Sequence, residues 1–123
     1  MTNINNQQHF IESFWDWTFL NDCFGETKIR VTDIDGLVER NGKFLLIETK
    51  MPSSPIPMGQ SIMHKGLLKT GSFTIFIIWG KPNATEEMQV ITTAKDHGIR
   101  KANNDTVKKM VKAWFDFANG RRA

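Results

Sequence analysis

The pair Asn41-Gly42 restricts the fold of this sequence more than any other local feature. It separates two runs, residues 28–40 and 43–51, in which the residue pattern has a period of two. Asn-Gly is the preferred pair for a two-residue type I′ turn, because both turn positions need a positive φ. The sequence therefore predicts a β-hairpin that reverses at residues 41–42.

This turn predicts which residues of the two strands face each other. With a two-residue loop at 41–42, paired residues have numbers that sum to 83, so Asp35 faces Glu48 and Asp33 faces Lys50. The period of two places all four side chains on one face of the sheet. Directly opposed residues have Cβ atoms about 5 Å apart, which brings two carboxylates and an ammonium group together.

Such a cluster has two interpretations. Opposed carboxylates repel each other, and a divalent cation between them removes the repulsion; Mg²⁺ and Mn²⁺ prefer oxygen ligands. Lys50 would then orient a water nucleophile or offset charge on a phosphate. The alternative is a structural ion pair between Asp33 and Lys50 beside a solvated edge. We favour the cation site, because the apolar run at residues 44–47 ends in charged residues, and such breaks in pattern concentrate at functional sites.

The remaining pattern predicts an α/β or α+β domain with a mixed central β-sheet flanked by helices. Three prolines mark residues 51–59 as a loop, and the apolar run at 73–79 is typical of a buried strand. The other predicted elements are helices at 8–20 and 60–69, an edge-like strand at 87–92, and an amphipathic C-terminal helix at 105–118 that Asn104 or Asp105 caps.

Composition sets the expected class of protein. A length of 123 residues predicts one domain over 1–123, and its small size leaves a role for a homodimer. No apolar run approaches the roughly 20 residues of a membrane span, and the N-terminus does not resemble a signal peptide. The single cysteine, Cys23, favours a reducing cytoplasm. Residues 95–123 hold three acidic and eight basic residues, which suits contact with phosphates such as those of DNA.

The series Asp35, Glu48, Thr49 and Lys50 resembles the motif of PD-(D/E)XK nucleases. The resemblance is greatest to compact phage and archaeal types such as Holliday-junction resolvases and VRR-NUC domains. It implies a restriction-endonuclease-like core of order αβββαβ, followed here by the C-terminal amphipathic helix. It also implies that Asp35 and Glu48 ligate Mg²⁺ with the Thr49 carbonyl, and that Lys50 is catalytic. Thr32 stands where the motif has Pro, and either Asp33 or Asp35 can be the first acid; we prefer Asp35.

Gln60 and His64 resemble the Gln-x-x-x-Tyr element of RecB-like nucleases, with His in place of Tyr. They lie one helical turn apart, and Gln60 is expected to hold a metal-bound water or a phosphate. Glu12 on the first predicted helix is either a further acid of the site or a solvated residue. The residues expected to contact the DNA backbone are Lys65, Lys69, Arg100 and Lys101.

Together these features predict a Mg²⁺-dependent DNA endonuclease, with Mn²⁺ as a substitute metal, that prefers branched or structured DNA. The expected location is the cytoplasm of a prokaryotic cell or of a phage host. The alternative function is a catalytically inactive nuclease fold that binds nucleic acid or a protein partner.

Overall fold

The computed structural model describes residues 12–120. The chain divides into two compact units, Met1–Asp33 and Ile34–Ala123, and each is described by itself. In the first unit, the 3-10 helix η1 (Trp17–Cys23) buries none of its residues. Asp16 caps it by accepting a hydrogen bond from the Thr18 backbone N–H. The predicted helix at 8–20 is wrong as one continuous helix: among its described residues, 14–16 are not helical, and a 3-10 helix begins at Trp17. Residues 8–11 lie outside the described range.

The second unit contains a five-stranded mixed sheet in the order β1-β2-β3-β4-β5. Strands β2 and β3 are parallel, and the other neighbouring pairs are antiparallel. This confirms the coarse α/β or α+β class, but two strands precede helix α2 and three follow it, unlike the expected order αβββαβ. The elements are β1 (Gly36–Arg40), β2 (Lys43–Lys50), α2 (Met58–Lys69), β3 (Phe73–Lys81), β4 (Ala84–Ile91), β5 (Asp96–Lys101) and α3 (Asn104–Asn119).

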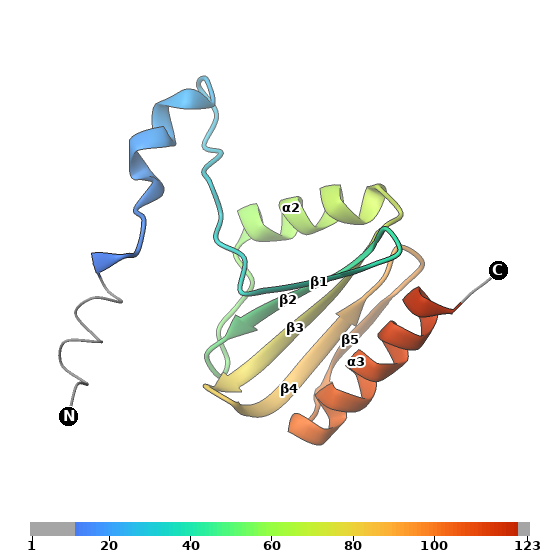
Figure 1. Ribbon diagram of the computed structural model, residues 1–123. Coiled ribbons are helices and arrows are strands. Elements are labelled where there is room, and N and C mark those ends of the chain that lie inside the picture. Colours follow the sequence, from blue (N-terminus) through green and yellow to red (C-terminus); the bar gives the residue numbers. More distant parts are fainter. Residues whose placement is uncertain (1–11, 121–123) are drawn as a thin grey trace. The chain divides into compact units, whose positions relative to one another are not determined.

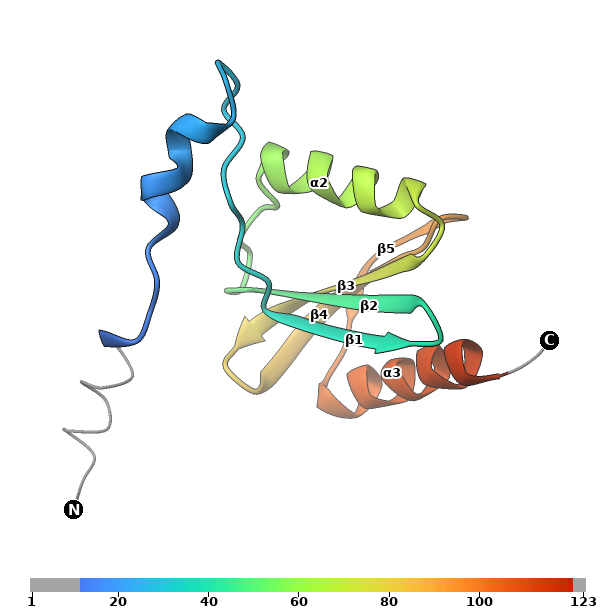
Figure 2. The same cartoon turned by 45° about the horizontal axis from the view of Figure 1, so that its top comes forward.

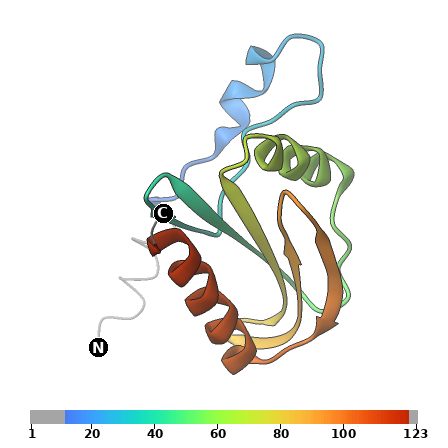
Figure 3. The same ribbon diagram turned by 90° about the vertical axis from the view of Figure 1, so that its right-hand side faces the viewer.

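Helices α2 and α3 cover opposite faces of this sheet (Figure 1, Figure 3). On the face that α2 covers, here called the α2 face, Leu46, Ile75, Ile77 and Trp79 pack against leucines of α2. On the α3 face, Trp114 and Ala118 of α3 pack against buried residues of the inner strands, which are Leu45, Phe76, Met88 and Val90. Successive residues of β2 and β3 thus alternate between two cores, as expected of strands buried on both sides.

The hairpin forms at the predicted turn. Asn41 and Gly42 have φ of 54° and 78°, and the β1–β2 pairs run from Arg40–Lys43 to Gly36–Ile47. The predicted register is therefore confirmed for these five pairs, while the predicted pairs Asp35–Glu48 and Asp33–Lys50 lie outside the ladder. Figure 2 shows β1 and β2 as neighbouring strands joined by this turn. The first strand is shorter than predicted, because it begins at Gly36. Asp33 consequently takes no place opposite Lys50 in the ladder; it belongs to the first unit, where its carboxylate accepts a hydrogen bond from Trp17 Nε1 at 2.9 Å.

Three further expectations about elements need correction. β4 is not an edge strand, because β3 and β5 pair with its two sides. β5 was absent from the expected elements, and all six of its residues are exposed. The N-cap of α3 is Asn103, which forms a capping box with Thr106, in place of Asn104 or Asp105. Across residues 12–120, no helix is both long enough and apolar enough to cross a membrane.

Candidate metal site around Glu48

Glu48 is a buried carboxylate on the α2 face, near the carboxyl end of β2. Its side chain is only 2% exposed, and it lies beside Ile77 of β3, which in turn pairs with Gln89 of β4. Burying an unpaired carboxylate is strongly unfavourable, so such a group needs partners. Glu48 Oε2 accepts a hydrogen bond from Gln60 Nε2 at 2.5 Å and lies 3.5 Å from His64 Nε2.

Both partners come from helix α2, which connects the parallel strands β2 and β3. Residues four apart lie above one another on the same side of a helix, so Gln60 and His64 reach the sheet together. The structure therefore brings to Glu48 the two residues that the sequence singled out on this helix. Among the described residues, the buried Gln60 Oε1 has no hydrogen-bond partner. An acceptor oxygen is thus left beside the carboxylate.

His64 is nine-tenths buried, and this burial lowers the pKa of its imidazole. The neighbouring Glu48 carboxylate raises the pKa, and the charge of Lys50 lowers it, but burial has the largest effect. The neutral imidazole is therefore favoured near pH 7. Its Nε2 has no hydrogen-bond partner among the described residues, so the His64 ring lies beside Glu48 without bringing a compensating positive charge to it.

Asp35 immediately precedes β1, and its side chain contacts the carboxyl end of β2. Its Oδ2 accepts hydrogen bonds from the Thr49 backbone N–H at 2.8 Å and from Thr49 Oγ1 at 3.1 Å. Thr49 lies between Glu48 and Lys50, and Lys50 shares the α2 face with Glu48 by strand alternation. Asp35 thus lies at the carboxyl end of β2, but its bonds are to Thr49, whose side chain lies on the α3 face, and not to Glu48 on the α2 face.

The donors here are oxygens of the kind that Mg²⁺ prefers. Asp35 and Glu48 offer carboxylates, and the unpartnered Gln60 Oε1 offers an acceptor to a cation or to its water. Within residues 12–120, no three His, Cys, Asp or Glu side chains gather as a metal-binding group. A cation at this place would therefore rely on two carboxylates, the Thr49 carbonyl and water, a set that fits Mg²⁺.

The other predicted residues lie apart from Glu48 or in the first unit. Glu12 and Asp33 belong to the first unit. The four basic residues expected to contact DNA are all exposed, two on α2 and two on the edge strand β5: Lys65, Lys69, Arg100 and Lys101.

Sequence reasoning missed Gln89 on the α2 face. Gln89 is 9% exposed, and its Nε2 donates two hydrogen bonds to the Asp96 carboxylate, at 2.9 and 3.0 Å. The signal available in the sequence was a polar residue between two apolar ones, Met88 and Val90. The structure shows that both of these neighbours are buried.

No protein-family model matches this sequence, and the comparisons with curated proteins and with solved structures give no match.

Proposed function

We propose that the protein is a Mg²⁺-dependent deoxyribonuclease that hydrolyses phosphodiester bonds. The observation that supports this best is the convergence on Glu48, a buried carboxylate that Gln60 hydrogen-bonds and that lies 3.5 Å from His64 Nε2. Glu48 is one residue from Thr49, which binds Asp35. If Glu48 had only a structural role, an apolar residue would fill its position without the cost of removing a carboxylate from water, since its neighbours on β2 and β3 are apolar. Its presence favours a role in chemistry.

Each residue has a role in this proposal. Asp35, Glu48 and the Thr49 carbonyl would hold Mg²⁺, which when bound stabilises negative charge on a phosphate and lowers the pKa of a bound water. Lys50 orients the attacking water and offsets charge on the phosphate oxygens. Gln60 fixes the Glu48 carboxylate through the 2.5 Å hydrogen bond. The preference for internal bonds in branched DNA rests on the resemblance to Holliday-junction resolvases and VRR-NUC domains.

The proposal is tested by incubating the protein with supercoiled, linear and four-way-junction DNA, in Mg²⁺, Mn²⁺ or EDTA. We expect cleavage with either metal, none in EDTA, and faster cleavage of the junction than of the linear duplex. Glu48→Gln and Lys50→Ala should each slow cleavage by at least about 100-fold. The exposed Glu86→Gln removes the same charge from β4 and should leave the rate unchanged.

The same samples distinguish the two candidate functions. If the wild-type protein binds these DNAs but cuts none of them with either metal, the nuclease proposal is wrong and the binding module is favoured. If Glu48→Gln cuts as fast as the wild type, the site is misassigned.

A further inference from the structure

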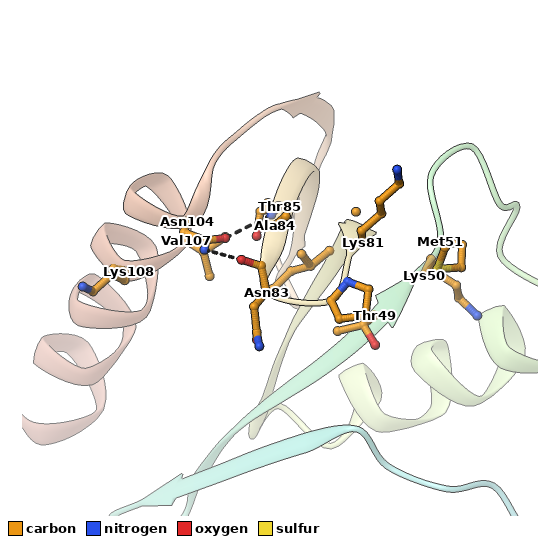
Figure 4. A pocket seen from close by; sticks show the side chains of 13 residues that line it. Thr49, Lys50, Met51, Lys81, Asn83, Ala84, Thr85, Asn104, Val107 and Lys108 are labelled. Carbon is orange, nitrogen blue, oxygen red and sulfur yellow. Dashed lines mark hydrogen bonds between the residues drawn. The ribbon is translucent and has the colours of Figure 1, made fainter.

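A cleft of about 600 Å³ opens at the end of the sheet where β2 finishes. Figure 4 shows its walls: the last residues of β2, the β3–β4 hairpin, and the first turns of α3. The volume is within the range of ligand-binding clefts in proteins. None of its lining residues entered the predicted site except Thr49 and Lys50.

Side-chain hydrogen bonds of Asn104 hold this cleft together. Asn104 Nδ2 donates to the Asn83 carbonyl at 2.7 Å, and its Oδ1 accepts from the Thr85 backbone N–H at 3.0 Å (Figure 4). These bonds fasten the tip of the β3–β4 hairpin to the start of α3. The two walls are therefore fixed relative to each other, and a ligand would find the cleft already formed.

The charge of the cleft is entirely positive over the described residues. Lys81 on the hairpin and Lys108 on α3 stand on its two sides, both exposed, and no Asp or Glu lines it (Figure 4). Its polar lining adds neutral hydrogen-bonding groups from Thr49 and Asn83. With Lys50 at the end of β2, three ammonium groups beside neutral polar groups line the cleft, which suits a chain of phosphates.

The cleft also meets the candidate metal site. Thr49 lines the cleft, and the same residue donates both hydrogen bonds to Asp35. Glu48 and Lys50 flank Thr49 along β2. Lys50 itself lines the cleft, so a phosphate chain with its scissile group at Lys50 would continue into it.

We propose that this cleft binds the phosphate backbone of the nucleic-acid substrate beside the scissile bond, with Lys81 and Lys108 as its phosphate contacts. The inference rests on the proposed nuclease function, since that function supplies the substrate. It assigns the backbone contact to the α3 side of the sheet end. Lys65 and Lys69 on α2, which the sequence suggested, become the rival surface.

The test is fluorescence anisotropy of a labelled 20-base-pair DNA duplex in EDTA, over a series of salt concentrations. Each phosphate contact contributes about 0.9 to the slope of log K against log salt concentration for duplex DNA. For Lys81→Ala/Lys108→Ala we expect weaker binding and a slope shallower by about 1.8. Lys109→Ala/Lys112→Ala removes the same charge from exposed positions of α3 outside the cleft, and should keep the wild-type slope.

A cleft variant with the wild-type slope would overturn the inference, as would a wild-type protein that binds no duplex. So would an equal loss in the Lys109→Ala/Lys112→Ala control, which would indicate a general charge effect. If the wild type cuts DNA while only Lys65→Ala/Lys69→Ala loses binding, the cleft assignment fails and the nuclease proposal stands. If the cleft variant loses binding but the wild type cuts no DNA with Mg²⁺ or Mn²⁺, the cleft stands and the nuclease proposal fails.

Discussion

Asp96 shows how one hydrogen-bonded carboxylate links the charge of β5 to stability. The two hydrogen bonds from Gln89 Nε2 lower the pKa of Asp96, and the Gly98 backbone N–H at 2.8 Å lowers it further. A carboxylate whose pKa is lowered by folding stabilises the folded state above its ordinary value of 3.8. That stabilisation is lost as the pH falls through the lower pKa of the folded state.

We therefore expect that, as the pH is lowered below 3.8, the free energy of unfolding falls less steeply for Asp96→Asn than for the wild type. Urea unfolding at several pH values between 6 and about 2.5 measures both slopes. Equal slopes in that range would show that Asp96 gains nothing from Gln89 in solution.

Among single residues, sequence reasoning identified those that interrupt an apolar pattern. Glu48 and Lys50 follow a run of apolar residues, and Gln60 stands on the next helix, so the sequence alone could indicate them. The cleft residues Lys81 and Lys108 could not be found this way. Each is a single exposed lysine in its own segment, and the structure is needed to show, through the bonds of Asn104, that the hairpin and α3 meet.

At the scale of elements, two glycines differ in whether their position has room for a side chain. A Cβ built on Gly80, at the bulge between β3 and β4, would collide with the Ala84 carbonyl oxygen. A Cβ on Gly66, within helix α2, would meet nothing within 4 Å. Gly80 is thus required for the close approach of two backbones at the cleft, whereas Gly66 only makes the unfolded chain more flexible.

From this contrast we expect Gly80→Ala to lower the free energy of unfolding by about 1–3 kcal/mol. Gly66→Ala should raise it by about 0.5–1 kcal/mol, because alanine is the better helix former. Chemical denaturation of the two variants and the wild type at neutral pH gives both values. A stabilised Gly80→Ala protein would mean that the bulge has another conformation.

The elements also differ in how much the sequence revealed of them. The hairpin, β3 and α3 follow from strong signals: an Asn-Gly turn, a continuous apolar run, and a helical apolar stripe. β5 has no such signal, because all of its residues are exposed and their order is not alternating. The helix predicted at 8–20 is interrupted at residues 14–16, because the aromatic residues at helical spacing form no buried face there.

For the whole molecule, the parallel pairing of β2 with β3 creates the candidate site. The connection between these strands contains α2, and the helix returns Gln60 and His64 over Glu48. The sequence singled out Gln60 and His64 but did not predict that they contact Glu48. It also did not predict the strand order around them, since strand order depends on pairings between distant segments.

Metal binding would appear in the stability of the whole protein. If Asp35 and Glu48 hold the cation, Mn²⁺ at about 100 times its Kd should stabilise the wild type by about 2.7 kcal/mol and raise its Tm. A thermal melt with and without Mn²⁺ measures this. Asp35→Ala should lose the rise, whereas Asp33→Ala, whose partner is Trp17, should keep it.

If Asp33→Ala lost the rise in Tm and Asp35→Ala kept it, Asp33 would be the ligand in place of Asp35. An unchanged Tm for the wild type at millimolar Mn²⁺ would argue against a cation site in the unbound protein.

The described sheet ends at β5, whose outer backbone groups have no strand beside them. An edge of this kind can template the addition of strands from other molecules. Here the strand is short and carries Asp96, Arg100 and Lys101, all exposed. A strand from a second molecule would have to desolvate these charged side chains in order to pair with β5. This edge of the sheet therefore resists the edge-to-edge pairing that leads to aggregation.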